Sequence, residues 1–359
     1  MISPADVPGR ANVVGVGLIG GSIGLALRER GWHVTGADLD PARLAKALEL
    51  GALDETGTDT QAAITFIATT VGTIAAAARR VLSDGTGVVT DVGSVKAPVI
   101  ADIDDPRFVG GHPMAGSEQE GVEGAQADLF DGATWVLTPT LETDPDAYTT
   151  VRSVVRSLGA EVVALPPERH DALVALVSHV PHLVAANLMA LASEGAEEHA
   201  AVLRLAAGGF RDMTRVAAGH PGIWLDICAE NREAIVASLD RLLAAIGTTR
   251  DMVDKGDRPG LLTALENARA GRANLPDQVT QTGELVEVRV PVPDRPGVLA
   301  EVTTMLGEID VNIVDLEIAH SPEGARGVLV FLVQVTASDR VREALTARRY
   351  RPTIRPLEP

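Results

Sequence analysis

The sequence has a single cysteine, few aromatic residues and fewer basic than acidic side chains. Cys228 has no second cysteine with which to form an intrachain disulfide, and its helical, apolar surroundings indicate a small core residue rather than a nucleophile. The 31 Lys and Arg residues stand against 49 Asp and Glu, and the resulting net charge of −18 argues against nucleic acid and anionic membranes as partners. Local basic pockets for a small anionic substrate remain compatible with this charge.

Neither a secretion signal nor a membrane-spanning segment is expected from the sequence. Residues 1–10 lack the basic start and the apolar stretch of a signal peptide. No uninterrupted apolar run approaches the roughly 18 residues that cross a bilayer. We therefore expect a cytoplasmic protein, whose 359 residues are enough for two or three domains with separate cores.

A glycine-rich turn near the start of the chain carries a specific pattern. From Val13 to Ser22, a short apolar run breaks into G-x-G-x-x-G and then into a helical pattern, which is typical of a dinucleotide-binding turn. Gly15 permits the tight turn, Gly17 lets the backbone approach a pyrophosphate, and Gly20 lets the helix pack against its strand. Free N–H groups at the helix start would bind anionic oxygens. The predicted cofactor-binding residues of the turn are Gly15, Gly17, Leu18, Ile19 and Gly20.

An acidic residue follows the next expected strand, residues 33–37, at the position where a ribose is usually bound. Asp38 lies 21 residues after Gly17, and its carboxylate can accept a hydrogen bond from a ribose 2′-hydroxyl. Because the same charge repels a 2′-phosphate, the sequence favours NAD over NADP. Arg43 is the nearby residue that could soften this preference.

Strand and helix patterns continue to alternate from Asp38 as far as Pro166 and Pro167. This alternation predicts a parallel sheet covered by helices on both faces, the Rossmann-type α/β class. The expected strands, besides 33–37, are 64–68, 88–91, 108–110, 135–137 and 161–165. The expected helices are 21–30, 71–82 and 146–158.

Two further units are expected after the dinucleotide-binding domain. Residues 168–275 are rich in Ala, Leu and Val at helical spacing, which predicts an all-helical domain whose broad apolar faces favour pairing with a second copy. A polar linker at 276–283 precedes strands at 285–292, 313–319, 327–335 and 353–355 and helices at 297–307 and 339–349. Their β-α-β-β-α-β order is that of the ferredoxin-like fold. The predicted domains are residues 1–166, 167–275 and 284–359.

Two polar loops are expected at the carboxyl ends of strands, where ligands bind in open α/β sheets. The first is Asp91–Lys96, and the second is Gly110–Glu118, whose glycines leave room around His112. Because oxidation of an alcohol needs an acceptor for its proton, a neutral histidine at this place is a candidate general base. Ser94 could fix the tautomer of the imidazole or bind the substrate. The alternative is that His112 only caps a turn.

Three histidines lie along the first expected helices of the second domain: His170, His179 and His182. The His-x-x-His spacing is compatible with a metal, but Pro181 disturbs the helical phase and no carboxylate or thiol completes a ligand set. We therefore expect no metal, and interpret these histidines as core or pocket-lining residues.

Two arginines further along share one face of an expected helix. Arg211 and Arg215 are four residues apart, and guanidinium groups bind carboxylates through two parallel hydrogen bonds. Either arginine is a candidate for binding an anionic substrate. The alternative is a solvated side chain paired with Asp212 or Glu230.

The combination of these motifs resembles the prephenate/arogenate dehydrogenase family of tyrosine biosynthesis, over about residues 10–275. The motifs that carry the resemblance are Gly15–Ser22, Asp91–Lys96, Gly110–Glu118, Ser178–His182 and Gly209–Arg215 followed by Trp224. One departure is Thr70, where many relatives have proline, and it affects only the local turn.

The resemblance implies roles for five residues. His112 would be the catalytic histidine, with Ser94 as its hydrogen-bonding partner at the substrate hydroxyl. Arg215 would anchor a carboxylate, with His179 and His182 near the substrate pocket.

The last domain resembles the ACT domain, a small-ligand regulatory module, through Val292–Leu299 and Asn312–Leu316. A helix that begins at Pro296 and Gly297 leaves backbone N–H groups open to a ligand carboxylate, and Asn312 could add a side-chain amide. The resemblance implies that the effector is tyrosine. The alternative is an accessory domain that only supports a dimer.

The expected function is NAD-dependent oxidative decarboxylation of prephenate by a homodimer, with arogenate as the alternative substrate. Hydride would leave the ring carbon that bears the hydroxyl, and loss of carbon dioxide would then make the ring aromatic without a metal. One rival is a β-hydroxyacid dehydrogenase, which would use a lysine that residues 167–231 lack. The other rival is a non-catalytic ligand sensor.

Overall fold

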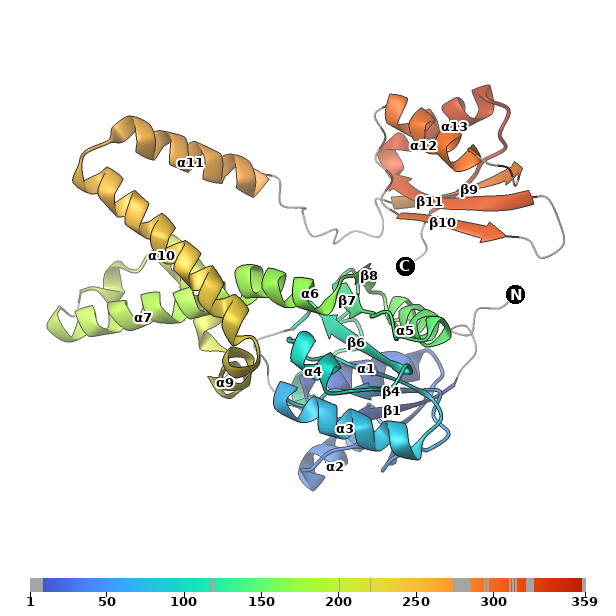
Figure 1. Cartoon of the computed structure of the whole chain (residues 1–359), viewed down its shortest axis with the longest axis horizontal. Helices are drawn as coiled ribbons and strands as arrows, with labels where there is room; N and C mark the ends of the chain where they lie inside the picture. Colours follow the sequence, from blue (N-terminus) through green and yellow to red (C-terminus); the bar gives the residue numbers. More distant parts are fainter. Residues whose placement is uncertain are drawn as a thin grey trace. The chain divides into compact units, whose positions relative to one another are not determined.

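The computed structural model describes residues 9–116, 119, 121–199, 201–219, 221–273, 285–293, 295, 297–309, 311, 313, 315–320 and 326–356. The chain divides into two compact units, residues 1–270 and 271–359, and each is described by itself (Figure 1). The predicted linker at 276–283 lies outside the described residues.

The first unit is built on an eight-stranded sheet with the order β3-β2-β1-β4-β5-β6-β7-β8. Its strands are β1 (Arg10–Val14), β2 (His33–Ala37), β3 (Glu55–Thr56), β4 (Ile64–Ile67), β5 (Val88–Asp91), β6 (Phe108–Pro113), β7 (Thr134–Thr138) and β8 (Glu161–Ala164). The Rossmann-type class is confirmed. Strands β1 to β6 form parallel pairs, and the glycine turn joins β1, in the middle of the sheet, to the first helix.

The expectation of a wholly parallel sheet is wrong at one pair of strands. β6 and β7 run antiparallel, with Gly110 opposite Thr138 and His112 opposite Val136. Among the described residues between these strands, the chain forms only a short 3-10 turn at Val122–Gly124, and it has no crossover helix to bring it back parallel.

Helices α1 (Leu18–Glu29), α2 (Pro41–Glu49), α3 (Val71–Asp84), α4 (Ala97–Ala101) and α5 (Pro145–Ser157) pack around this sheet (Figure 1). Ile23 and Leu27 of α1 are fully buried beside Phe66 of β4 and Trp135 of β7. Burying each such side chain contributes about 1.5–3 kcal/mol. The sequence patterns did not predict α2, β3 and α4. Helix α2 begins at a proline, and the preceding residue, Asp40, caps the helix through its carboxylate.

The rest of the first unit is helical, as predicted. It contains α6 (Pro167–Val174), α7 (Val180–Glu198), α8 (Gly208–Thr214), α9 (Pro221–Glu230), α10 (Arg232–Asp254) and most of α11 (Arg258–Ala273). A π-helical turn, Ala175–His179, joins α6 to α7 just before Pro181, whose missing N–H breaks the regular hydrogen-bond ladder. Figure 1 shows α7 and α10 extending away from the sheet.

One helical stretch differs from the expectation that no segment could cross a bilayer. Pro167–Ala196 is long and apolar enough to do so by length and composition, with a mean hydropathy of 1.6 in its most apolar window. Only 28% of that window is buried within the chain. Pro181 was expected to disturb the helical phase, whereas the helical stretch continues through it by way of the π-helical turn.

The second unit has the predicted β-α-β-β-α-β order. It consists of β9 (Leu285–Pro293), α12 (Val298–Glu308), β10 (Asp315–His320), β11 (Arg326–Gln334), α13 (Ser338–Ala347) and β12 (Thr353–Pro356). The antiparallel sheet has the order β10-β11-β9-β12 and buries Val288, Leu306 and Phe331. This arrangement confirms the ferredoxin-like class.

Candidate active site

The glycine turn forms an open cradle at the start of α1. Gly15 has a φ of +92°, and a Cβ there would lie 2.5 Å from the Ala68 carbonyl oxygen. A Cβ on Gly20 would collide with the Gly15 carbonyl oxygen, whereas one on Gly17 would meet nothing within 4 Å. Gly17 is also the N-cap of α1 and supplies no side-chain cap, so the first N–H groups of the helix stay open. These features fit the pyrophosphate of a dinucleotide.

Asp38 lies beside this cradle at the end of β2. Its Oδ2 accepts a hydrogen bond from the Val16 N–H at 2.8 Å, and its Oδ1 accepts one from the Asp40 N–H at 2.9 Å. Arg43 Nη1 is 3.2 Å from Oδ1. Burial opposes the charged form of Asp38, but the Asp40 and Val16 amides and Arg43 outweigh it and hold the pKa of the carboxyl below its usual value. Asp38 is therefore ionised at neutral pH, while Arg43 offsets part of its charge.

A cavity of about 560 Å³ joins the glycine turn to the two predicted loops. It contains Gly17, Leu18 and Ile19 together with Ser94 and His112. From the helical part, the residues that line it are Gly219, Ile223, Asp226 and Ile227. The structure thus brings the proposed base into the same space as the dinucleotide cradle.

His112 lies on a strand rather than in the loop that its flanking glycines predict. β6 continues through His112 to Pro113 because this segment pairs with β7. Burial is the main cause that lowers the pKa of His112 well below its usual value, and the coulombic interactions with His170, Lys96 and His179 act in the same direction. The imidazole is therefore neutral near pH 7 and can accept a proton.

The neighbour of the His112 ring is His170, which the sequence predicts to be a core or pocket-lining residue. His112 Nδ1 is 2.8 Å from His170 Nε2, and His170 Nδ1 is 2.8 Å from Asp171 Oδ1. Among the described residues, His170 rather than Ser94 is the partner of His112 Nδ1. The sequence signal that could have indicated it is the adjacent His-Asp pair at the start of α6.

A buried ion pair supports the strand ends beneath His112. Lys96 and Asp91 are both fully buried and form a salt bridge. Lys96 Nζ also donates to the Gly111 carbonyl oxygen at 2.8 Å, and Asp91 accepts hydrogen bonds from the N–H groups of Gly93 at 2.8 Å and Gly111 at 3.0 Å. Burial lowers the pKa of Lys96, while Asp91 opposes that shift. The pair therefore ties the end of β5 to β6 at Gly111, the residue before His112.

His179 and His182 belong to a cluster with Trp224 and Asn231. His179 is 1% exposed, its Nδ1 is 3.2 Å from Asn231 Nδ2, and its pKa falls to about 4, mainly through burial. His182 stacks on Trp224 with ring centroids 3.5 Å apart. A Cβ on Gly219, which lines the cavity, would lie 3.6 Å from His182 Cε1. His182 therefore lies at the edge of the cavity.

The two arginines lie on the stretch that precedes this edge. Arg211 belongs to α8 and Arg215 begins the 3-10 turn Arg215–Ala218, and both side chains are exposed. Neither is part of the described lining of the His112 cavity. The structure therefore does not bring Arg215 together with His112 within the described cavity wall.

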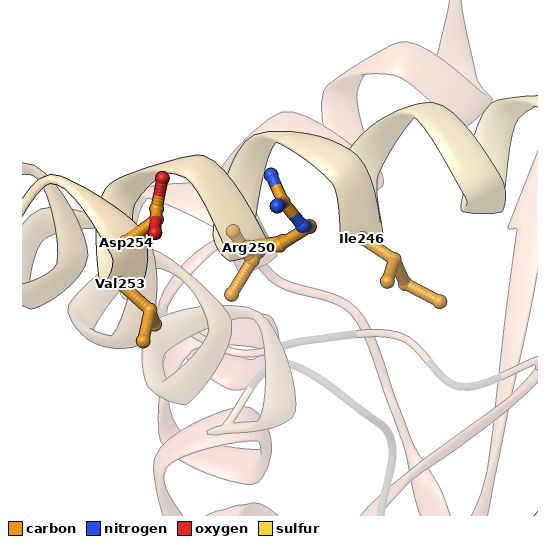
Figure 2. A pocket seen from close by; sticks show the side chains of 5 residues that line it. Ile246, Arg250, Val253 and Asp254 are labelled. Carbon is orange, nitrogen blue, oxygen red and sulfur yellow. The ribbon is translucent and has the colours of Figure 1, made fainter.

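Two other features lie apart from the His112 cavity. Cys228 is half-buried against Ala175, Ile227 and Ile235, and burial raises the pKa of its thiol, as a core residue requires. A hollow of about 510 Å³ follows one face of α10 and is lined by Ile246, Thr249, Arg250, Val253 and Asp254 (Figure 2). Because a single helix lines it, this hollow needs another surface to enclose a ligand.

In the second unit, Gly297 has a φ of +86° and is the N-cap of α12 without a side-chain cap. This geometry suits glycine and leaves the first N–H groups of α12 uncapped by a side chain. The other two predicted effector residues, Pro296 and Asn312, lie outside the described residues.

Three family models match the chain. They are described as "Prephenate dehydrogenase, nucleotide-binding domain" over residues 23–164, "Prephenate dehydrogenase, dimerization domain" over 166–267, and "ACT domain" over 286–352. Prephenate dehydrogenase of Bacillus subtilis is 34% identical over 335 residues, which cover 88% of this chain and 90% of the relative. The chain belongs to the prephenate dehydrogenase family. The first match begins after the glycine turn, so the assignment of that turn depends on its own geometry.

Solved structures of family members share the fold of about three quarters of this chain. Prephenate dehydrogenase from A. aeolicus, solved with hydroxyphenyl propionate and NAD⁺, superposes with a TM-score of 0.70 and 30% identity, covering 74% of this chain and 98% of that one. Arogenate dehydrogenase from Synechocystis superposes with a TM-score of 0.64 and 32% identity, covering 74% and 99%. Family membership makes this chain a nicotinamide-dependent dehydrogenase with an ACT domain.

Proposed function

We propose that this chain catalyses the NAD-dependent oxidative decarboxylation of prephenate to 4-hydroxyphenylpyruvate and carbon dioxide. The observation that carries the proposal is the position of His112, a neutral imidazole in one cavity with the open cradle at Gly17. Relatives named for prephenate and for arogenate both match the chain, and arogenate is therefore the alternative substrate.

The chain's residues would bind, orient and deprotonate the substrate. When bound, NAD supplies the acceptor for the hydride that leaves the ring carbon bearing the hydroxyl. His112 takes the hydroxyl proton, and Ser94, on the same cavity wall, donates or accepts a hydrogen bond at that hydroxyl. The carbonyl that forms on the ring accepts the electron pair released when the ring carboxylate leaves as carbon dioxide. The ring then becomes aromatic, which makes the step effectively irreversible.

The cofactor preference follows from the charge beside the cradle. Asp38 holds a negative charge where a ribose would lie and would repel a 2′-phosphate. Arg43, at 3.2 Å from Asp38, moderates that repulsion without removing it. NAD is therefore the preferred cofactor.

The substrate carboxylates require cationic partners. We assign this role to Arg215, because the turn that it begins ends beside Gly219 on the cavity wall. His182 lies against Gly219, and His179 contacts Trp224 through an edge-to-face ring pair with centroids 6.1 Å apart. These two histidines would shape the pocket around the ring.

The helical part would form the interface of a homodimer. Large apolar side chains are exposed along its helices, among them Leu191, Leu243, Ile246, Val253, Leu262 and Leu265. Exposed apolar side chains of this size favour a partner surface, and the matching family model is described as a dimerization domain. The same reasoning applies to Pro167–Ala196, where the half-buried His182 and the exposed Asn187 favour a protein partner over lipid. A cytoplasmic location follows from this reading and stays a prediction.

The ACT domain would bind tyrosine as an effector. Gly297, the N-cap of α12, leaves the first N–H groups of the helix without a side-chain cap, as binding of an amino-acid carboxylate requires. A chain ending at residue 283 should keep dehydrogenase activity and lose any response to tyrosine. Equal inhibition of the truncated and full chains would show that tyrosine acts at the active site instead.

The direct test is to follow NADH formation with prephenate and with arogenate. A larger kcat/KM for prephenate supports the proposal, and a larger value for arogenate supports the alternative. Turnover of a 3-hydroxyacid alone would favour a β-hydroxyacid dehydrogenase. Binding of NAD and tyrosine without turnover of any of these substrates would identify a sensor.

A further inference from the structure

We propose that His170 and Asp171 are positioning residues that hold His112 in the tautomer with its proton on Nδ1 and its lone pair on Nε2. This inference deepens the proposed function and rests on it, since it concerns how the proposed base is made ready. It predicts which nitrogen of His112 accepts the substrate proton.

An ionised carboxylate can only accept hydrogen bonds. Asp171 Oδ1 lies 2.8 Å from His170 Nδ1, so that ring nitrogen carries a proton. A neutral imidazole then has its lone pair on Nε2. His170 Nε2 lies 2.8 Å from His112 Nδ1, and His112 must therefore donate from Nδ1. The remaining nitrogen of His112, Nε2, keeps its lone pair for the substrate hydroxyl.

The carboxylate of Asp171 is held in one orientation by its hydrogen-bond donors. Asp171 Oδ1 also accepts from the Lys96 N–H at 2.8 Å, and Oδ2 accepts from the Ala97 N–H at 2.8 Å, where α4 begins. Asn231 Nδ2 donates to the Asp171 carbonyl oxygen at 2.9 Å. Because both carboxylate oxygens have donors, Asp171 cannot turn away from His170 without breaking hydrogen bonds.

His170, which lies between Asp171 and His112, has little freedom to rotate. His170 is completely buried and Asp171 is 5% exposed, so water cannot replace either partner of the ring. The rings of His112 and His170 meet edge to face at 76°, with centroids 5.1 Å apart, which directs Nε2 of one ring toward Nδ1 of the other. A second proton on His170 would make its Nε2 a donor and reverse the direction of the hydrogen bond to His112.

Lys96, Asp91 and His179 are the charged and titratable neighbours of the hydrogen-bonded series Asp171–His170–His112. Lys96 and Asp91 form their own ion pair beneath the strand, and His179 lies in the cluster around Asn231. Lys96 reaches Asp171 through its backbone N–H, while its ammonium contacts Asp91 and Gly111. Asp171 is therefore the group that determines the proton position on His170.

A matched pair of substitutions separates positioning from packing. Gln and Met have side chains of similar length, but only Gln offers an oxygen that can accept from His112 Nδ1. His170→Met should lower kcat for prephenate by roughly 10²-fold or more, and His170→Gln by no more than roughly tenfold. KM for prephenate and the Kd for NAD should stay near the wild-type values in both variants. Asp171→Asn should resemble His170→Met, because an amide can donate to His170 and reverse its tautomer.

An equal loss of kcat in the Gln and Met variants would overturn the proposal, because a purely structural role predicts no difference between them. If the variants fail to fold, the wild-type enzyme still gives an answer through ¹⁵N NMR of labelled histidine. The signals of His112 are assigned by their loss in His112→Asn. We expect a protonated, pyrrole-type Nδ1 and an unprotonated, pyridine-type Nε2 at neutral pH.

The opposite pattern, or a doubly protonated His170, would refute the inference even in an active enzyme. Absence of turnover with prephenate and arogenate would instead refute the proposed function. It would not affect the measurement of the His112 tautomer.

Discussion

The buried pair of Lys96 and Asp91 offers a quantitative test of how the active-site strands are held. Lys96→Met removes the ammonium and keeps a chain of similar length. It leaves the fully buried carboxylate of Asp91 with two amide donors and no cation, and it leaves the Gly111 carbonyl oxygen without its 2.8 Å donor. Removing one partner of a buried ion pair costs about 3–5 kcal/mol. That is a large part of the roughly 5–15 kcal/mol that stabilises a domain.

The measurement is the free energy of unfolding in urea, followed by tryptophan fluorescence and circular dichroism at one fixed protein concentration. Trp135, fully buried on β7, reports on the same sheet. Adding Asp91→Asn to Lys96→Met should recover at least about 1 kcal/mol, because it neutralises the stranded charge. As the control, Lys46→Met removes the exposed pair with Glu49 and should cost less than about 1 kcal/mol. A loss below about 1 kcal/mol for Lys96→Met, or no recovery in the double variant, would refute this reasoning.

Three further predictions concern the substrate, the cofactor and pH. Arg215→Ala should raise KM for prephenate strongly with the fold intact; if Arg211→Ala alone did so, the other arginine would be the anchor. Asp38→Ala should weaken NAD binding more than NADP binding, and an unchanged ratio of the two Kd values would place the ribose elsewhere. Because the pKa of His179 is about 4 in the fold against 6.5 unfolded, the unfolded chain binds more protons between these values, and stability falls as pH drops from 6.5 to 4. The loss should approach about 3 kcal/mol by urea unfolding, and His179→Gln should flatten this slope.

The local features of the fold could be predicted because neighbouring residues specify them. The glycine turn, Asp38 at the end of β2 and the ferredoxin-like order follow from patterns within short stretches. The extension of β6 could not be predicted in this way. Gly110 and Gly111 are poor strand formers, yet they occur in the strand because a Cβ on Gly110 would collide with Thr138 Oγ1, and one on Gly111 would lie 2.6 Å from the Asp91 carbonyl oxygen.

The site was predictable in part for the same reason. His112 and Ser94 can be identified from the short polar loops in which they occur, and the structure places both in one cavity with the glycine turn. The contact between His112 and His170 spans 58 residues, and no spacing rule connects a strand to a distant helix start. The continuity of the long helical stretch could not be predicted either. Pro181 predicts a break in the helix, but a π-helical turn accommodates the proline.

The central claim is that His112 removes the substrate proton beside the dinucleotide cradle. The measurement that tests it most directly is kcat of His112→Asn with prephenate and NAD, with the Kd for NAD measured on the same preparation. A general base contributes about 10²–10⁴-fold, so kcat should fall by that factor while the Kd for NAD stays unchanged. Near-normal turnover by His112→Asn would contradict the account.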